Sequence, residues 1–342
     1  MLLDFNNLEI NNLHPETDFE KKAIIFLKEW FSESKTVKVQ TSGSTGTPKI
    51  IEIEKEKMLN SAKMTCDFLD LKKGDTALVC LPIEYISGKM MVVRAMTRKL
   101  KLIISDPSLK PLENLNENID FCAMTPLQVG NSLHKIHFIK NLIIGGAAVS
   151  ESLKKKISET LLLSNPPTKI YETYGMSETL SHIALKKTHP IQDQYFNVFD
   201  DIKISTDERN CLKIYAPQLN SEILQTNDLV EIKNTNQFKF LGRIDNVINS
   251  GGAKIFPEQL EALVKKEIAN EVVFLGVKDE SLGQKLILVI EGFASENLKS
   301  QISNLKFEKS FHKPKDIIFV KEIPRTPNGK VNRLELKSIF DI

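Results

Sequence analysis

Residues 76–105 read TALVCLPIEYISGKMMVVRAMTRKLKLIIS, and the spacing of their apolar residues changes twice. A strand-like run at 76–81 leads into a helix-like segment at 87–100, and a second strand-like run follows at 101–105. A strand, a helix and a strand in this order are typical of layered α/β proteins, in which the helix carries the chain back to a parallel neighbour. The stretch therefore predicts an α/β fold with a largely parallel sheet.

The same alternation continues toward both ends of the chain. Helix-like segments include residues 19–31 and 150–163, and further strand candidates lie at 121–125, 141–146 and 168–175. Sheets of this kind bind ligands at the carboxyl ends of their strands. The segments IIGGAAV (143–149) and YETYGMSET (171–179) both leave a strand candidate for a loop with small residues, as a ligand site there would require.

The character of the sequence changes after about residue 243. A loop that contains Gly251 and Gly252 precedes a helix expected to begin near Pro257, a residue that the first helical turn tolerates. Later segments supply strand candidates at 271–277, 285–292 and 316–320, with helices near 295–306 and from about 331. We therefore predict a large N-terminal α/β domain at residues 1–244 and a small α+β domain at residues 245–342.

Composition favours a globular protein of the cytoplasm. The 342 residues are 41% hydrophobic and carry a net charge of +2, so no global charge points to nucleic acid or to an anionic membrane. The four cysteines include no CxxC pair, which disfavours a zinc site or a disulfide framework. We see no signal peptide and no apolar run of transmembrane length.

Residues 40–49, QTSGSTGTPK, resemble a phosphate-binding loop without matching the common GxxxxGK[ST] pattern. Only two residues separate Gly43 from Gly46, and Lys49 follows Pro48. The next residues, IIEIEKEK, alternate like a strand and not like a helix. Backbone N–H groups and hydroxyls in such a loop can surround an anion, whereas the alternative is a polar hairpin turn.

Four segments in a fixed order resemble the motifs of the adenylate-forming enzymes, which include acyl-CoA synthetases, luciferases and peptide-synthetase adenylation domains. The segments are TSGSTGTPK (41–49), YETYGMSET (171–179), the stretch from 228 to 261 with GRIDNVINSGGAKIF, and PRTPNGKVNR (324–333). Within that superfamily, LPIEYISGKMMVVRA, IGGAAVS and YGMSETLSHIAL most resemble the o-succinylbenzoate–CoA ligases of menaquinone biosynthesis. The resemblance implies an enzyme that uses ATP, Mg²⁺ and CoA on a carboxylic acid.

The resemblance also implies roles for individual residues. In the family, the loop at 41–49 holds the β- and γ-phosphates of ATP while the acid attacks the α-phosphorus. The implied phosphate-loop residues are Thr41, Ser42, Gly43, Ser44, Thr45, Gly46 and Lys49. The implied adenine-site residues are Gly145, Gly146, Ala147, Tyr174 and Gly175. Asp228 and Arg243 match the residues that contact the ribose, Glu178 matches the Mg²⁺ ligand, and Thr179 would lie near the α-phosphate.

The C-terminal motifs imply a moving domain. Lys330 matches the catalytic lysine of adenylate formation, and an ammonium there can stabilise developing charge. Asp245 matches the hinge of a rotation between the two half-reactions. Gly251 and Gly252 would then line a tunnel for CoA.

The acid pocket is less well specified. Tyr85 stands where most relatives have histidine, so the gating role of that side chain is open. Lys89 and Arg94 could pair with a second carboxylate of the acid, but they are five residues apart and do not share a helical face. At most one can point into the pocket, and solvent exposure of either is the alternative.

Other interpretations stay open from the sequence. The enzyme could act on another aryl or short acyl acid, or load a carrier thiol as a stand-alone adenylation enzyme. A nucleotide-binding protein without catalysis is the alternative from another class. The segment before residue 41 is shorter than usual in the family, so a reduced N-terminal layer could leave a surface for a homodimer.

Overall fold

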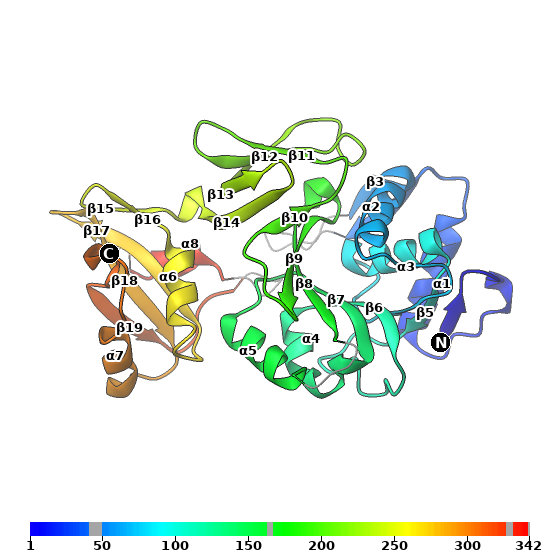
Figure 1. Ribbon diagram of the computed structural model, residues 1–342, viewed down its shortest axis with the longest axis horizontal. Helices are drawn as coiled ribbons and strands as arrows, with labels where there is room; N and C mark the ends of the chain where they lie inside the picture. The colour runs from blue at the N-terminus through cyan, green and yellow to red at the C-terminus, as the bar shows by residue number, and fades with distance from the viewer. Residues whose placement is uncertain (41–49, 163–166, 326–330, 341–342) are drawn as a thin grey trace.

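The computed structural model describes residues 1–40, 50–162, 167–325 and 331–340. One large sheet dominates it (Figure 1). In spatial order its strands are β1 (Leu2–Asp4), β5 (Lys101–Ile104), β4 (Thr76–Val79), β6 (Ile119–Met124), β7 (Ile139–Ile144), β8 (Lys169–Gly175), β9 (His182–His189), β10 (Phe196–Val198), β14 (Gln237–Arg243), β13 (Leu224–Asn234), β12 (Cys211–Tyr215) and β11 (Lys203–Thr206).

The α/β prediction is confirmed, but the expectation of a largely parallel sheet is wrong. Strands β5, β4, β6, β7 and β8 run parallel to their neighbours. From β8 onward every pairing is antiparallel, and β1 also joins β5 in the antiparallel sense. The reason is the short link from β8 to β9, which contains only the 3₁₀ turn η3 (Ser177–Thr179) and no crossover helix.

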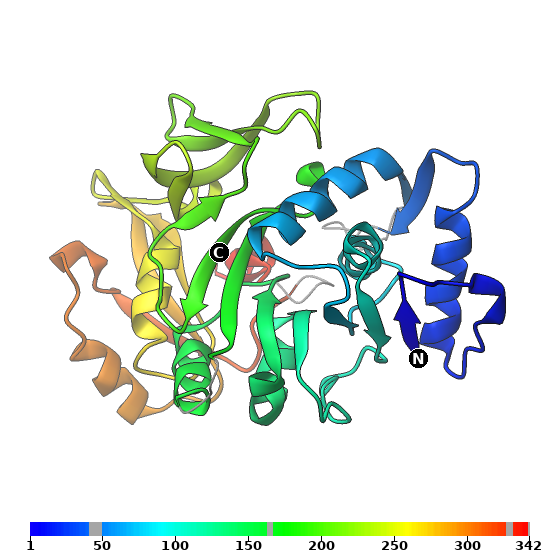
Figure 2. The ribbon, with the colours of Figure 1, turned by 45° about the vertical axis from the view of Figure 1, so that its right-hand side comes forward.

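Helices cover both faces of the parallel strands (Figure 2). On one face lie α1 (Asp18–Trp30), α2 (Lys55–Phe68) and α3 (Ile86–Arg98), and on the other lie α4 (Pro126–Asn131), η2 (Leu133–Phe138) and α5 (Glu151–Thr160). Alternate residues of one strand therefore enter different cores: Ala77 and Val79 of β4 pack with the first set, and Leu78 with the second. Burial on both faces explains why these strands read as continuous apolar runs.

Helix α1 confirms the segment predicted at 19–31. Thr17 and Glu20 form a capping box at its start, and the apolar stripe that includes Phe19, Phe26 and Leu27 is buried. The strand expected after residue 49 is also present as β3 (Ile50–Glu54), which pairs with β2 (Thr36–Gln40). That strand ends at Glu54, and α2 follows at once, a helix that the sequence did not predict.

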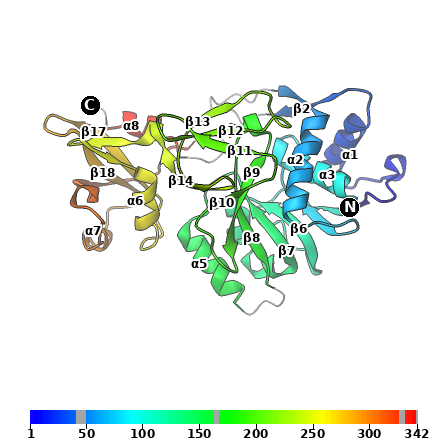
Figure 3. The same cartoon turned by 45° about the horizontal axis from the view of Figure 1, so that its top comes forward.

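The chain after β14 forms a second sheet beside β13 and β14 (Figure 3). Its strands are β16 (Ala253–Ile255), β15 (Ile248–Ser250), β18 (Gly283–Glu291), β17 (Val272–Asp279) and β19 (Asp316–Val320). The associated helices are α6 (Pro257–Val264), α7 (Glu296–Ser303) and α8 (Arg333–Ser338), and the short 3₁₀ turns elsewhere are η1 (Ile10–Asn12), η4 (Ile244–Asn246) and η5 (Ser310–His312). As predicted, α6 begins at Pro257.

The second sheet also has an apolar core on each face. Val272 and Phe274 of β17 face α6, and Val273 and Leu275 face α8. The domain boundary between residues 244 and 245 stays a prediction. None of the helices in the described ranges combines the length and the apolar character needed to cross a bilayer.

Candidate active site

Tyr174 and Asp228 meet where β8 ends. The Tyr174 hydroxyl donates a 2.5 Å hydrogen bond to Asp228 Oδ2, and the tyrosine is only 9% exposed. Its ring packs edge-on against Phe238, with centroids 4.9 Å apart. Burial and the nearby Asp228 carboxylate raise the pKa of Tyr174, so the hydroxyl stays protonated and remains a donor.

Arg243 links this pair to the connection between the two sheets. Asp228 and Arg243 lie opposite each other in the β13–β14 ladder, and Arg243 Nη1 is 3.5 Å from Asp228 Oδ1. The other guanidinium nitrogen, Nη2, donates to Asp245 Oδ2 at 2.8 Å. Asn227 Nδ2 also donates to Asp245 Oδ1, at 3.1 Å. The predicted ribose residues and the predicted hinge residue thus form one polar network.

The turn after β8 is tightly constrained. A Cβ on Gly175 would lie 2.4 Å from the Ser181 carbonyl oxygen, so only glycine fits there. Leu180 has φ of +65°, a conformation that costs energy in a residue with a side chain. Thr179 is fully buried, and its hydroxyl contacts the carbonyl oxygens of Met176 and Ser181 at 3.0 and 2.8 Å. In this structure Thr179 therefore holds the turn together.

Glu178 lies on the same turn with its side chain exposed. Asn220 Nδ2 donates to its backbone carbonyl at 3.3 Å. Within the described part of the chain, its carboxylate forms no ion pair. An exposed carboxylate with this freedom fits a hard cation such as Mg²⁺, which binds oxygen ligands and keeps several waters.

Gly145, Gly146 and Ala147 follow the neighbouring strand, β7, as predicted. A Cβ on Gly145 would lie 2.8 Å from Thr173 Oγ1, and Gly146 has φ of +87°. The loop continues to Val149, whose N–H donates to Glu172 Oε1 at 3.3 Å. This loop and the Tyr174 turn thus leave adjacent parallel strands at the same edge of the sheet.

The alternative that Lys89 and Arg94 are solvated is wrong for both residues. Lys89 is 6% exposed and Arg94 is 2% exposed. They point to different neighbours, because Lys89 Nζ lies 4.3 Å from the centre of the Phe26 ring. Arg94 Nη2 instead donates a 2.8 Å hydrogen bond to Ser181 Oγ, beside the Thr179 turn. Only Arg94 is therefore joined directly to the strand ends that carry the other candidate residues.

The positive charge of Arg94 has few stabilising partners among the described residues. Among the residues that the structure describes, its Nε is buried without a hydrogen-bond partner, and its Nη1 meets only Met91 Sδ, at 3.9 Å. No carboxylate pairs with the guanidinium among the described residues. Burial lowers the pKa of Arg94 to about 10, which still leaves it protonated at neutral pH. A buried cation of this kind is costly unless an anion completes it.

Tyr85 is the N-cap residue of α3 and is half-buried. It forms a parallel bridge with Gln40, and Gln40 N donates to the Glu84 carbonyl at 3.0 Å. Gln40, the last described residue before the predicted phosphate loop, is therefore fixed next to the start of the helix that carries Arg94. Residues 41–49 themselves lie outside the described residues.

The two remaining predictions concern the CoA tunnel and the catalytic lysine. Gly251 and Gly252 form the turn of the β15–β16 hairpin with φ of +54° and +81°, as a two-residue hairpin loop requires. Across the ranges that the structure describes, no hydrogen bond joins this turn to Tyr174 or Asp228. Lys330 lies outside the described residues.

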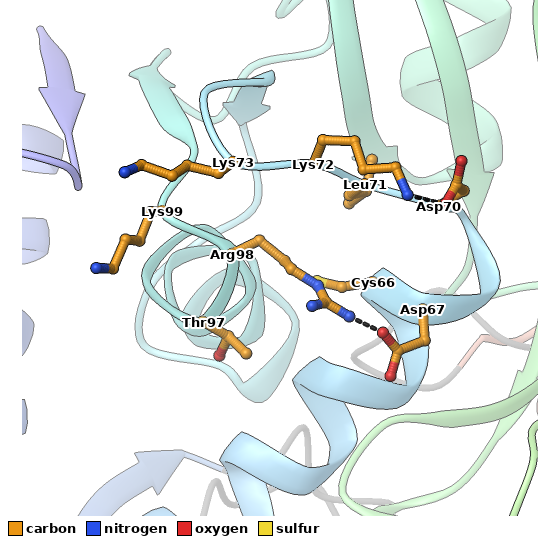
Figure 4. A pocket seen from close by; sticks show the side chains of 9 residues that line it. All are labelled: Cys66, Asp67, Asp70, Leu71, Lys72, Lys73, Thr97, Arg98 and Lys99. Atoms are coloured by element: carbon orange, nitrogen blue, oxygen red, sulfur yellow. Dashed lines mark hydrogen bonds and ion pairs between the residues drawn. The ribbon is translucent and has the colours of Figure 1, made fainter.

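A surface hollow of about 440 Å³ lies away from all of these residues (Figure 4). It is lined by the ends of α2 and α3, and its Arg98 is already paired with Asp67. None of the predicted site residues contributes to it. The hollow therefore does not mark the candidate active site, which lies at the strand ends.

Sequence comparison places the chain among known proteins. The model of the AMP-binding enzyme family matches residues 33–203. A solved acyl-CoA synthetase (AMP-forming)/AMP-acid ligase II-like protein from Dyadobacter fermentans is 33% identical, with a TM-score of 0.67 and 99% of each chain covered. The chain belongs to the AMP-binding enzyme family.

More distant matches of this AMP-binding enzyme have named activities. The 2-succinylbenzoate–CoA ligase of Lactococcus lactis is 26% identical over 89% of this chain and 71% of the relative. The 3,4-dihydroxybenzoate–[aryl-carrier protein] ligase of Bacillus anthracis is also 26% identical, over 93% and 76%. The o-succinylbenzoate–CoA synthetase of Bacillus subtilis, solved with ATP and magnesium ion, shares the fold at 19% identity, with a TM-score of 0.72 and coverage of 88% and 69%. Membership and these matches identify an AMP-forming acid–thiol ligase.

The sequence did not single out the partners of Arg94. Ser181 and His182 lie within the quoted segment YGMSETLSHIAL. Ser181 meets Arg94 only through the folding of a distant strand end onto α3, and the partner of His182 comes from α2, which was not predicted. Thr65 of that helix contacts the His182 ring at 3.0 Å. In the sequence, these two residues were marked only as a polar pair, Ser181 and His182, that closely follows the YGMSET turn.

Proposed function

We propose that this AMP-binding enzyme is an ATP-dependent acid–CoA ligase and that its acid is 2-succinylbenzoate. The carboxylate of the acid attacks the α-phosphorus of ATP and releases pyrophosphate. The thiol of CoA then displaces AMP and forms the thioester. The named activity of the Lactococcus lactis relative and the resemblance of the segment at residues 81–95 support this choice.

The observation that carries the substrate assignment is that Arg94 has no carboxylate partner among the described residues. 2-Succinylbenzoate has two carboxylates, so one remains free while the other is activated. Arg94 is buried, lacks a carboxylate partner within the described ranges and bonds to Ser181 beside the Thr179 turn. A substrate carboxylate would complete this site, because guanidinium groups bind carboxylates with two parallel hydrogen bonds.

The remaining predicted residues are assigned to the nucleotide. Tyr174 and the Gly145–Ala147 loop would hold the adenine, and Asp228 with Arg243 the ribose. Glu178 would bind Mg²⁺, which neutralises phosphate charge when present. The loop at 41–49 would bind the departing pyrophosphate, and Lys330 would act in adenylate formation.

A panel of acids tests the proposal. The purified protein is given ATP, Mg²⁺ and CoA with 2-succinylbenzoate or with 4-oxo-4-phenylbutanoate, which lacks the carboxylate on the ring. We expect kcat/KM for 2-succinylbenzoate to be higher by about tenfold or more, the size of a charged hydrogen bond. Equal kcat/KM values for the two acids would contradict the assignment of Arg94 to a second carboxylate. If neither acid gave a thioester, the proposed substrate would be wrong.

A carrier-protein ligase for an aryl acid is the second candidate. It is favoured by one observation: the Bacillus anthracis aryl-carrier ligase is as identical to this chain, at 26%, as the Lactococcus lactis 2-succinylbenzoate–CoA ligase is. The same assay distinguishes the two candidates when 3,4-dihydroxybenzoate is added to the panel. AMP release that requires an acid but does not increase with CoA would favour the carrier-protein ligase.

A further inference from the structure

A chain of polar groups reaches from Arg94 into α2. Ser181 Oγ lies 2.8 Å from Arg94 Nη2 and 3.3 Å from His182 Nδ1. The other ring nitrogen, His182 Nε2, lies 3.0 Å from Thr65 Oγ1. Thr65 Oγ1 in turn lies 3.2 Å from the Ser61 carbonyl oxygen. Arg94, His182 and Thr65 are all buried, so their hydrogen-bonding groups have little access to water.

The two ends of this chain fix the direction of its hydrogen bonds. Arginine can only donate, so Ser181 Oγ accepts from Arg94 and keeps its own proton for another acceptor. The Ser61 carbonyl can only accept, so Thr65 donates to it and accepts from His182 Nε2–H. His182 Nδ1 is then unprotonated and accepts the Ser181 proton. In this arrangement all four contacts become hydrogen bonds.

The other neutral tautomer satisfies fewer groups. With the proton on Nδ1, Ser181 Oγ would accept from both Arg94 and His182, and its own hydroxyl proton would lose its partner. Thr65 would donate to Nε2 and give up the Ser61 carbonyl. Ser181 is half-buried, so its hydroxyl has limited access to another acceptor, and the tautomer that keeps all four hydrogen bonds, Nε2–H, is favoured. Burial and the adjacent Arg94 charge also lower the pKa of His182, so the ring stays neutral.

We infer that His182 is a positioning residue for the substrate's free carboxylate: as the Nε2–H tautomer it takes the Ser181 proton and so directs the Ser181 lone pair at Arg94. The inference rests on the proposed function for its effect on substrate choice. The Ser181 hydroxyl proton then points toward His182, so the free carboxylate of the substrate is bound by the N–H groups of Arg94 alone. The guanidinium is thereby held in one orientation before the acid binds. This lowers the entropy that is lost when the side chain is ordered on binding.

Two substitutions of His182 separate its two nitrogens. His182→Asn places an amide oxygen near the position of Nδ1 and can still accept from Ser181. His182→Gln places an amide N–H near Nε2, which can still donate to Thr65, but it leaves Ser181 without its acceptor. His189→Asn is the matched control, because His189 is also buried and lies at the other end of β9.

The kinetic readout is the ratio of KM values for 4-oxo-4-phenylbutanoate and 2-succinylbenzoate. We expect His182→Gln to reduce this ratio about tenfold by raising KM for 2-succinylbenzoate, with kcat nearly unchanged. His182→Asn and His189→Asn should keep the wild-type ratio. A folded His182→Gln variant with the wild-type ratio would overturn the inference, and so would equal losses in the Gln and Asn variants at position 182.

A second measurement does not depend on the substrate. Long-range ¹H–¹⁵N correlation spectra of the ¹⁵N-labelled wild-type protein distinguish protonated from unprotonated imidazole nitrogens, and the His182→Asn spectrum assigns the signal. We expect His182 to carry its proton on Nε2 between pH 7 and 8. A proton on Nδ1 would overturn the inference even if 2-succinylbenzoate is the substrate. Failure of both acids in the kinetic assay would instead count against the proposed function and leave this spectrum to decide the role of His182.

Discussion

The hydroxyl of Tyr174 donates a 2.5 Å hydrogen bond to Asp228, although the two residues are 54 positions apart in the chain. The bond joins the last parallel strand of the sheet, β8, to β13 in its antiparallel half. Because the Tyr174 ring is also packed against Phe238, the phenol has little freedom to turn away. Asp228 is consequently held in one orientation, with Oδ2 on the phenol and Oδ1 toward Arg243.

Tyr174→Phe should therefore weaken ATP binding while leaving the fold intact. The ring that would contact adenine remains, but Asp228 loses the donor that orients it. We expect KM for ATP to rise by about three- to tenfold, the usual range for one hydrogen bond. The measurement is pyrophosphate exchange at saturating acid.

Tyr195→Phe is the matched control for that substitution. Tyr195 donates to the Glu231 carboxylate at 2.7 Å, but this second tyrosine–carboxylate pair is exposed. Its loss should leave KM for ATP unchanged. Equal effects from the two substitutions would show that Tyr174 does not act through Asp228.

The sequence predicted elements best where apolar residues follow one regular spacing. The strands of the parallel half were all recognised, since both of their faces are buried. Helix α2 was missed because its buried face includes Ser61, Ala62 and Thr65 as well as Met58 and Cys66. This face has too little apolar contrast to stand out from the alternating residues before it.

The candidate site was predictable only in part, for a different reason. Motifs marked Tyr174, Glu178 and Asp228, since each lies in a recognisable segment of sequence. The surroundings of Arg94 were not predictable, because its partner Ser181 comes from a distant strand end. Five-residue spacing correctly indicated that Lys89 and Arg94 face different neighbours, but it could not show that both are buried.

Arg94→Met should separate stability from substrate binding. Methionine removes a buried charge that has no carboxylate partner in the described ranges, and replacement of such a charge by an apolar side chain is often neutral or stabilising. We expect an unchanged or higher Tm, together with a rise of about tenfold or more in KM for 2-succinylbenzoate. Thermal unfolding and thioester formation measure the two effects.

Lys89→Met provides the comparison on the same helix. Lys89 is also buried, but its ammonium lies over Phe26 and not beside Ser181. We expect its KM for 2-succinylbenzoate to stay near the wild-type value. If Lys89→Met raised KM as much as Arg94→Met, the free carboxylate would not be bound specifically by Arg94.

His182 should make the folded protein sensitive to mild acid. Burial, and then the charge of Arg94, hold its folded-state pKa well below the ordinary value of 6.5. Below pH 6.5 the unfolded chain binds a proton that the folded chain does not, so the free energy of unfolding falls as pH falls. The slope from this one group is about 1.4 kcal/mol per pH unit, and it ends where the folded-state histidine itself becomes protonated.

Urea unfolding of the wild type and of His182→Asn between pH 5 and 8 isolates this contribution. Other titrating groups, including His189, are common to both proteins and cancel in the difference. The stability difference between them should be constant above pH 7 and should shift in favour of the variant below pH 6.5. A difference independent of pH would mean that His182 is protonated equally in the folded and unfolded chains.

Asp245→Pro tests the proposed rotation between the two half-reactions. Asp245 lies in the short turn η4, directly between β14 and the first strand of the second sheet. If the second sheet must turn for Lys330 to act in one step and the Gly251–Gly252 hairpin in the other, large φ and ψ changes are required at this link. Proline fixes φ near −65° and removes a backbone donor.

The expected result is that one half-reaction is largely kept and the other is lost. Pyrophosphate exchange measures adenylation, and thioester formation from preformed acyl-adenylate measures the second step. Asp245→Ala is the matched control, because it removes the contacts to Arg243 and Asn227 while the backbone can still turn. Loss of the same half-reaction in both variants would assign the effect to the side-chain network, whereas survival of both rates in Asp245→Pro would place the pivot at another residue.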